Sequence, residues 1–345
     1  MNKLKYENEL VFMSKYVGMR NDYVQAGGGN TSIKISDAEM IIKSSGVQLS
    51  EVSKDYGISY VEYKKIRDLL HIKDEKNTIS INENSILEKT LIKGSKPSIE
   101  TFLHSLTNKY TIHIHSSIIN ILTCQKDGFK ILKNIFTDAI YVDYALPGIE
   151  LAQKVFSNYK NNKPSLIFLK NHGIIVSGDS CEDTIKKLNN IVQKTADFLN
   201  IDITKYNNIS KIYLTYLKVC SKFNNIIYLS EDENINLAMK KNNGSLWKYN
   251  LFPDSIVYCG LNPLKLQKCT IKEIEKDKEH TLIEYDENLY INSVSLKKAR
   301  EIESVLSSTA YIFLNSKNKK FDFINNNEKM KIDVAESEKY RKAMV

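Results

Sequence analysis

The chain has 345 residues, of which 42% are hydrophobic and 26% are charged, and this balance excludes a wholly disordered protein. Its length suits two domains or one elaborated domain, and neither a signal peptide nor a membrane-spanning apolar run is predicted. The net charge of +8 comes from lysines spread along the whole chain, so no basic stripe indicates nucleic-acid binding.

Up to residue 200 the sequence predicts strands that alternate with helices. In chain order we expect a helix over 7–17, a Gly-rich turn at 27–30, strands at 31–35 and 40–43, a turn at 44–46, helices over 85–94 and 98–106, a strand at 110–115, a helix over 117–122, a strand at 139–142, a helix over 150–159, a hairpin at 165–176 and a capped helix over 181–199. Residues 54–83 alternate too weakly for an assignment. This alternation predicts an α/β layer architecture.

Beyond residue 200 part of this pattern returns at a constant spacing. Three pairs of like residues are 116 positions apart: Asp138 and Asp254, Pro147 and Pro263, and Leu166 and Leu282. The segments TDAIYVDYALPG and PDSIVYCGLNPL predict equivalent strands at 139–142 and 256–259, each followed by a hairpin and a capped helix. The spacing favours a duplicated αβ unit, and chance similarity between two αβ units is the alternative.

Three of the six histidines stand where they can share a metal ion. His113 and His115, at positions i and i+2 of a predicted strand, project from one face, while Ile112 and Ile114 project from the other. His172 lies at the predicted hairpin turn, where the following glycine relaxes the backbone. The alternatives are exposed surface histidines for the strand pair and a structural role for His172.

Glu100 adds a carboxylate in the first turn of the helix predicted over 98–106. Alone, this residue is equally well explained as a charge that favours the helix N-terminus. Together with three imidazoles, it predicts a zinc-type site that keeps room for a substrate oxygen.

Two Gly-rich turns and the start of a helix are candidate anion contacts. Residues 28–31 and 44–46 offer backbone N–H groups, hydroxyls and an amide with little steric bulk. Ser98 begins a helix, and Lys43 adds a positive charge beside the second turn. Neither turn is a Walker loop, because Gly-Lys-Ser/Thr is missing, and the alternative is that each is only a turn.

The ordered segments GGGNTSIK, IIKSSG, KPSIETFLH, IHIHS, YALPGIELA and LKNHGIIVSG resemble the class II aldolase/adducin family, whose enzymes include L-fuculose- and L-rhamnulose-phosphate aldolases. The resemblance covers about residues 8–200. It implies an α/β layered fold with a central β-sheet flanked by helices in a domain over 1–200. The segments LFPDSIVYCGLNPL and AESEKYRK, in a C-terminal αβ domain over 201–345, resemble the aldolase portion of rhamnulose-phosphate aldolase/dehydrogenase fusion proteins; no dehydrogenase half follows.

The resemblance also implies roles for single residues. His113, His115 and His172 would hold one zinc ion per chain, with Glu100 as the catalytic acid or base. Tyr144 falls near a tyrosine that some aldolases use as a proton donor, with a different spacing. The positions that match or adjoin the family's phosphate contacts are Asn30, Thr31, Lys43, Ser45, Gly46 and Ser98. Ile99 stands where fuculose-phosphate aldolases have a second serine, so one hydroxyl contact is missing.

These features predict a zinc-dependent aldolase that cleaves or forms a phosphorylated ketose, with dihydroxyacetone phosphate and an aldehyde on the other side of the reaction. We expect partial burial to raise the pKa of Glu100 toward neutrality. The alternatives are an epimerase, dehydratase or decarboxylase on the same scaffold, or a metal-free adducin-like interaction protein. Short family members place their active sites between subunits of a ring, which implies a homo-oligomer.

Two further expectations concern the second half and the location of the protein. The strand that would correspond to His113 and His115 is sought at 226–230, which has no histidine, so the second copy is expected to bind no zinc. The five cysteines form no C-x-x-C pair, which argues against a disulfide framework and favours the cytoplasm. The expected partner is a small sugar phosphate, with no nucleic acid or membrane.

Overall fold

The computed structural model describes residues 2–71, 82–158, 164–220, 223–241, 250–261, 263–274, 280–317 and 320–334. The chain divides into two compact units, residues 1–203 and 204–345. The AESEKYRK segment and Tyr159, where a helix was expected to end, lie outside the described residues.

The first unit contains α1 (Asn2–Gly18), β1 (Asn30–Lys34), β2 (Met40–Lys43), η1 (Leu49–Glu51), β3 (Ile58–Val61), α2 (Tyr63–His71), α3 (Glu83–Thr90), β4 (Leu91–Gly94), α4 (Thr101–Ser105), β5 (Tyr110–Ile114), α5 (Ser117–Thr123), α6 (Gly128–Ile135), β6 (Ile140–Val142), α7 (Ile149–Asn158), β7 (Leu166–Leu169), β8 (Gly173–Gly178) and α8 (Cys181–Leu199). Its eight strands form one sheet in the order β4-β3-β2-β1-β5-β8-β7-β6. All neighbouring strands are antiparallel except β6 and β7, which are parallel.

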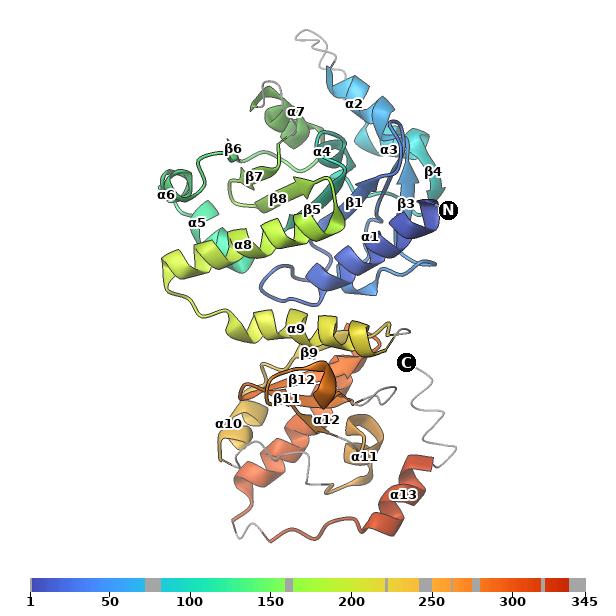
Figure 1. Cartoon of the computed structure of the whole chain (residues 1–345), viewed down its shortest axis with the longest axis vertical. Coiled ribbons are helices and arrows are strands. Elements are labelled where there is room, and N and C mark those ends of the chain that lie inside the picture. Colours follow the sequence, from blue (N-terminus) through green and yellow to red (C-terminus); the bar gives the residue numbers. More distant parts are fainter. Residues whose placement is uncertain are drawn as a thin grey trace. The chain divides into compact units, whose positions relative to one another are not determined.

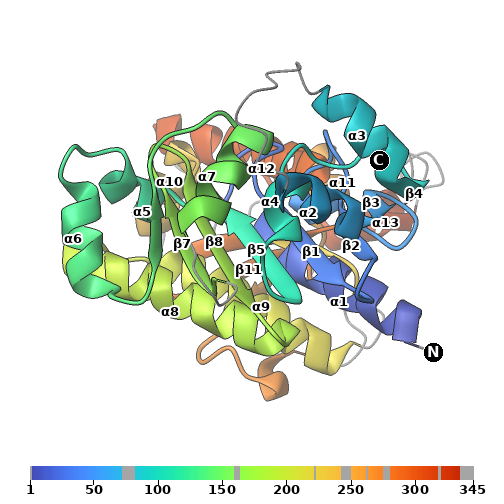
Figure 2. The ribbon, with the colours of Figure 1, turned by 90° about the horizontal axis from the view of Figure 1, so that it is seen from above.

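Helices cover both faces of this sheet, as the α/β prediction requires. Helices α1 and α8 lie on one face, and α2, α4 and α7 lie on the other (Figures 1 and 2). Between the sheet and the helices α2, α4 and α7 lies a core of buried residues that includes Phe102, Leu103, Leu151, Ile167 and Ile175. The predicted α/β class with a central sheet flanked by helices is therefore confirmed.

Most of the elements predicted in this unit are present, and two differ. The helix expected over 85–94 ends at Thr90, because residues 91–94 form the edge strand β4, which pairs with β3. The helix expected over 98–106 is only α4, which begins at Thr101. The long helix α8 begins as predicted, with the Ser180 hydroxyl accepting a hydrogen bond from the Asp183 N–H at 3.1 Å.

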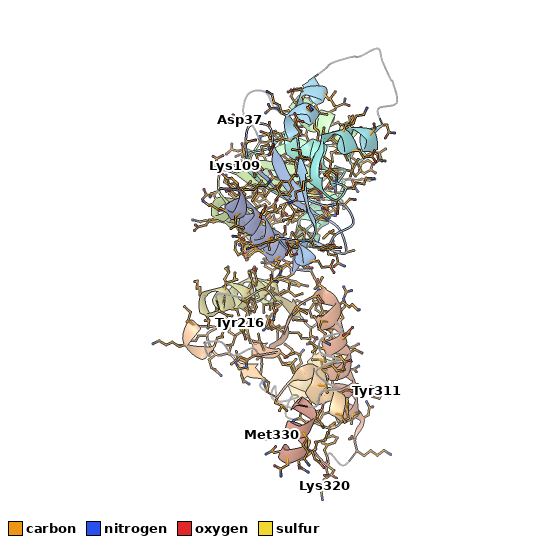
Figure 3. The ribbon with its side chains drawn as sticks, turned by 90° about the vertical axis from the view of Figure 1, so that its right-hand side faces the viewer. Asp37, Lys109, Tyr216, Tyr311, Lys320 and Met330 are labelled. Carbon is orange, nitrogen blue, oxygen red and sulfur yellow. The ribbon has the colours of Figure 1, made fainter. Side chains whose placement is uncertain are left out.

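The second unit contains α9 (Thr204–Val219), β9 (Ile226–Leu229), α10 (Glu233–Lys241), α11 (Pro253–Cys259), β10 (Leu264–Lys265), η3 (Ile271–Glu273), β11 (Leu282–Tyr285), β12 (Asn288–Ser293), α12 (Leu296–Asn315) and α13 (Asn326–Val334). Its sheet has the order β10-β11-β12-β9. Residues of α10, α11 and α12 pack on one face around Leu289 and Ile291. Tyr311 of α12 and Met330 of α13 are exposed, with 60% and 66% of their surface accessible (Figure 3).

The second sheet has the strand order and directions of one half of the first. The neighbours β9-β12, β12-β11 and β11-β10 are antiparallel, antiparallel and parallel, and so are β5-β8, β8-β7 and β7-β6. The predicted hairpin after Leu282 and the capped helix after it are present. The strand predicted at 256–259 is wrong, because Pro253 begins helix α11, and the strand in that place of the sheet is β10.

Candidate metal centre

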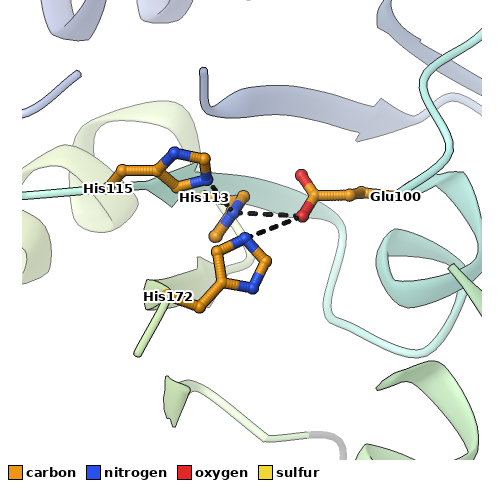
Figure 4. Close-up of side chains that lie close together, drawn as sticks. All are labelled: Glu100, His113, His115 and His172. Carbon is orange, nitrogen blue, oxygen red and sulfur yellow. Dashed lines mark hydrogen bonds and ion pairs between the residues drawn. The ribbon is translucent and has the colours of Figure 1, made fainter. Parts of the chain in front are cut away.

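The three histidines and Glu100 come together at one end of β5. His113 lies in β5, His115 follows the last residue of that strand, and His172 lies in the tight connection between β7 and β8. Glu100 immediately precedes α4, one of the helices that lie on one face of the sheet (Figure 2). One nitrogen or oxygen atom from each of the four residues lies within 4.8 Å of the others (Figure 4).

The distances within this cluster are those of groups that face a common centre. His113 Nε2 lies 3.0 Å from His115 Nε2, and Glu100 Oε1 lies 3.3 Å from His113 Nε2 and 3.2 Å from His172 Nε2. The side chain of His113 is fully buried, and those of Glu100 and His172 are 7% and 13% exposed. The alternative of exposed surface histidines is therefore wrong for His113.

The donor set fits a divalent cation. His113 Nδ1 lies 2.9 Å from the backbone oxygen of Ile174, which can only accept, so Nδ1 carries a proton and Nε2 is the nitrogen that faces the cluster and could coordinate an ion. Two Nε2 lone pairs at 3.0 Å repel each other unless a proton or a cation lies with them. Three imidazoles and a carboxylate are ligands that zinc prefers, and a backbone carbonyl behind one imidazole is the usual support.

The ionisation of the cluster is set by its burial and by the ion pair within it. Burial acts to raise the pKa of Glu100, but His113 and His172 outweigh it and hold that pKa well below 4.5. Burial acts to lower the pKa of His113, but Glu100 outweighs it and raises that pKa above 6.5. Burial, followed by His113 and His172, lowers the pKa of His115 to about 3. The expected rise of the Glu100 pKa is therefore wrong in this arrangement, because the neighbouring imidazoles favour the ionised carboxylate.

Glu100 does not cap its helix. It occupies the N-cap position of α4, but its side chain makes no capping hydrogen bond. Instead, its second carboxylate oxygen accepts a hydrogen bond from Asn30 Nδ2 at 2.6 Å. Asn30 is directly opposite His113 in the β1-β5 ladder, which places both side chains on one face. Asn30 therefore orients the carboxylate toward the histidines, while Glu100 keeps its place at the N-terminus of α4, where a negative charge is favoured.

The buried Lys43 connects the two Gly-rich turns. Its Nζ donates to the carbonyl oxygens of Gly27 at 3.0 Å and of Val47 at 2.7 Å. Burial lowers the pKa of Lys43 to about 8, with Glu100 acting in the opposite direction. The ammonium group therefore fixes the separation of the turns and adds positive charge near the cluster.

The remaining candidate anion contacts lie at the second turn and before α4. Ser45 and Gly46 are exposed, and the space where a Gly46 side chain would begin is open. Gly46 has a φ of +76°, a conformation that favours glycine. The Ser98 hydroxyl accepts from the Glu100 N–H at 3.3 Å, which leaves its own proton for another acceptor.

Thr31 projects away from the cluster, and Tyr144 lies exposed in a connecting segment. Thr31 follows Asn30 in β1 and therefore projects from the opposite face, where its hydroxyl pairs with that of Ser14 at 2.6 Å. The assignment of Thr31 as a phosphate contact is a misprediction, since its hydroxyl is fully buried against α1. Tyr144 is 56% exposed between β6 and α7, and no hydrogen bond of its hydroxyl is found within the described ranges.

Reasoning from the sequence missed Asn120, which lies on α5. Its Nδ2 donates to the backbone oxygen of His172 at 3.1 Å and lies 3.5 Å from that of His115. The sequence did contain a signal, because Asn120 lies five residues after His115, a candidate metal ligand. It is the one polar residue in an otherwise apolar run over 118–122.

A cavity of about 280 Å³ lies away from this cluster. Its lining includes Lys34, Asp37, Tyr63 and Lys109, at the other end of β1 and β5 from Asn30 and the histidines (Figure 3 labels Asp37 and Lys109). All three protons of Lys34 have backbone acceptors, the carbonyl oxygens of residues 104, 107 and 108. This cavity is therefore separate from the cluster of three histidines and Glu100.

Comparison with known proteins gives relatives that cover more than half of this chain. A protein of Bacillus subtilis strain 168, named uncharacterized oxidoreductase YuxG, is 28% identical over 212 residues, which are 57% of this chain and 30% of that protein. The chain thus spans less than a third of this relative. The N-terminal class II aldolase domain of a Thermoplasma acidophilum protein is 25% identical, with a TM-score of 0.50 over 55% of this chain and 92% of that one.

A second similar structure is an L-fuculose-1-phosphate aldolase from Thermus thermophilus. It is 14% identical, with a TM-score of 0.38 over 56% of this chain and 94% of that one. In no helix of the described residues is there a stretch long and apolar enough to cross a membrane. The family model described as class II aldolase and adducin N-terminal domain matches residues 8–196, more than half of the sequence, and the chain belongs to that family.

Proposed function

We propose that the protein is a zinc-dependent aldolase that cleaves or forms a phosphorylated ketose, releasing or consuming dihydroxyacetone phosphate and an aldehyde. The observation that carries this proposal is the convergence of three imidazoles and one carboxylate in a chain of the class II aldolase family. A non-catalytic interaction protein has no need of two imidazole Nε2 atoms 3.0 Å apart beside a buried carboxylate.

His113, His115 and His172 would hold the ion, with Glu100 beside it. When bound, a divalent cation would withdraw electron density from the substrate carbonyl and stabilise the negative charge that develops on its oxygen. His113 is kept in the required tautomer by the Ile174 carbonyl. Burial of the cluster limits access of water to its polar atoms.

Glu100 would carry the proton. In the cleavage direction, the substrate hydroxyl loses a proton, the carbon–carbon bond breaks, and its electron pair remains on the carbon of the triose phosphate fragment. That carbon must then gain a proton, and Glu100 is the carboxyl group that the cluster presents. Asn30 fixes the orientation of this carboxylate through the 2.6 Å hydrogen bond to its second oxygen.

The substrate phosphate would lie at the turn of Ser45 and Gly46, between Ser98 and the positive charge of Lys43. The open space at Gly46 and the free proton of the Ser98 hydroxyl support this placement. Asn30, which the resemblance also assigns to the phosphate, has a buried Oδ1 without a partner in the described chain, so its amide has capacity for a further contact with substrate. Tyr144 stays a prediction as a proton donor.

We also propose that residues 1–200 carry the chemistry and that residues 201–345 are a degenerate copy without metal ligands. The shared strand order of the two sheets supports this division. Within the described ranges, the only group of residues suited to a metal is the one around Glu100. A homo-oligomer in the cytoplasm and a small sugar phosphate as partner complete the proposal.

The test is a set of ketose 1-phosphates supplied to the purified chain, before and after removal of metal with a chelator. Release of triose phosphate, measured by a coupled reduction, is expected with metal and absent without it. Epimer formation without triose phosphate would favour an epimerase on the same scaffold. Full release after complete metal removal would refute the metal-dependent mechanism, and absence of both metal and turnover would favour an interaction protein.

A further inference from the structure

Helix α5 follows the strand that carries two of the candidate ligands and turns back against the hairpin that carries the third. The Ser116 hydroxyl accepts from the Ile119 N–H and so begins the helix directly after His115. Ile119 and Leu122 are buried and anchor the helix in the unit. Asn120 is half-buried on this helix.

The amide of Asn120 contacts the backbone of two candidate ligands. Its Nδ2 donates to the carbonyl oxygen of His172 at 3.1 Å and lies 3.5 Å from that of His115. Its Oδ1 accepts from the Thr123 hydroxyl at 2.9 Å. Both carbonyl oxygens can only accept, so the orientation of the amide is fixed by chemistry as well as by Thr123.

The hairpin tip depends on this helix for its position. The Asn171 N–H donates to the backbone oxygen of Thr123 at 3.2 Å, and Asn171 has a φ of +55°. Gly173 allows the tip to approach β5, because a Cβ there would lie 2.2 Å from the Ile114 backbone oxygen. His172 lies outside the paired residues of β7 and β8; its N–H donates to the Leu169 backbone oxygen at 3.3 Å, and its own backbone oxygen accepts from the Asn120 side chain at 3.1 Å.

We propose that Asn120 is a positioning residue of the metal centre, which holds the backbones of His115 and His172 at a fixed separation and thereby raises the affinity for the ion. This inference rests on the metal site proposed above. A ligand set that is held in place before the ion arrives loses less conformational freedom on binding than one that must be gathered. Partners behind metal ligands commonly change metal affinity by about 10–100-fold when they are removed.

Metal affinity is the measurement that tests this role, independently of any catalytic activity. Zinc is titrated into the metal-free protein in competition with a chromophoric chelator, and Co²⁺ is bound as a spectroscopic probe of ligand geometry. Asn120→Ala is expected to weaken zinc binding by about 10–100-fold and to alter the Co²⁺ absorption. Asn120→Asp keeps the shape but turns oxygen atoms toward two carbonyl oxygens, so it is expected to weaken binding further.

A matched control separates positioning from general stability. Asn189 on α8 makes a comparable pair of side-chain bonds, donating to the Tyr16 hydroxyl and accepting from the Tyr23 hydroxyl, both at 2.7 Å. Asn189→Ala is expected to leave zinc affinity within about twofold of the original. Equal weakening by Asn189→Ala, or unchanged zinc affinity in Asn120→Ala, overturns the proposal.

A second variant covers the case in which Asn120→Ala does not fold. Thr123→Val keeps the shape and the backbone oxygen that Asn171 uses, and removes only the hydroxyl that orients the Asn120 amide. It is expected to weaken zinc binding to a smaller extent than Asn120→Ala, and unchanged affinity contradicts the proposal. If the original chain binds no zinc, the proposed function fails; if it binds zinc and the variants bind equally well, only the role of Asn120 fails.

Discussion

Gly28 limits the position of the His115 ring, and a single methyl group at this residue tests the metal centre. A Cβ at Gly28 would lie 2.8 Å from His115 Nδ1 and 3.3 Å from its Cε1. Ordinary contact begins at 3.4 Å, so the ring or the turn must move by about 0.6 Å. The turn cannot simply retreat, because the same Cβ would lie 3.1 Å from the Gln25 carbonyl oxygen.

A displacement of this size is large for a metal ligand. Zinc–nitrogen distances are held to within about 0.2 Å, so a ring moved by about 0.6 Å must reorient or cease to be a ligand. We expect Gly28→Ala to weaken zinc binding by about 10–100-fold, the range found when the support of a ligand is disturbed. Gly28 has no positive φ, so the change adds steric bulk without backbone strain.

The neighbouring glycine provides the control. Gly27 also lacks a positive φ, and a Cβ there would have nothing within 4 Å. Zinc affinity is measured by chelator competition for Gly27→Ala and Gly28→Ala, together with the thermal midpoint of each metal-free protein. Similar midpoints with weak binding only in Gly28→Ala are expected. Equal zinc affinity in the two variants would show that His115 is not a ligand, and the reasoning from the cluster would fail.

Three further substitutions test separate parts of the site. Glu100→Gln is expected to retain zinc while turnover falls by about 10²–10⁴-fold, because it removes the proton carrier, and unchanged turnover refutes this role. His172→Ala is expected to abolish bound metal, and elemental analysis showing a full equivalent of zinc contradicts the ligand assignment. His104 has a pKa lowered to about 3 by burial, so the unfolded chain binds a proton that the folded chain does not as the pH falls below 6.5. The free energy of unfolding should therefore drop by about 1.4 kcal/mol per pH unit between pH 6.5 and 3 on account of His104. His104→Asn, which can keep the bond to Ser32, should reduce the slope of denaturant-derived stability against pH by one proton, and an unchanged slope contradicts the assignment.

The cluster of three histidines and Glu100 was predictable because local rules fix most of its parts. Alternation in a strand sets the side of His113, and the hairpin turn sets the place of His172. The sequence around Glu100 did not determine its role. A carboxylate at the start of a helix can be a charge that is favoured at the helix N-terminus, or it can belong to a metal site. Only the packing of α4 over the sheet directs this carboxylate to the histidines rather than to the helix N–H groups.

The incorrect predictions came from local sequence patterns whose residues belong to a different secondary-structure element from the one assumed. Thr31 was grouped with a turn, whereas β1 begins at Asn30 and therefore sends Thr31 to the opposite face. Ile256 and Val257 are suited to a strand, but Pro253 fixes the φ of a first helical turn and the segment becomes α11. Asn120 depends on a contact with residue 172, 52 positions away, which no local pattern contains.

The second sheet explains why a similar strand order need not carry a similar site. Tyr110 is paired with Gly178 in the first sheet, and Ile226 is paired with Ser293 in the second. His113 lies three residues after Tyr110, and Leu229 lies three residues after Ile226, so Leu229 takes the position of His113 in the second sheet. By the same count, Glu231 takes the position of His115. Leu229 is buried and cannot coordinate an ion, so the proposed copy has kept the hydrophobic pattern that forms the sheet and has no equivalent of the central ligand. Selection for folding alone preserves apolar alternation, whereas a metal site needs several specific side chains at once, and the loss of one central imidazole is enough to remove it.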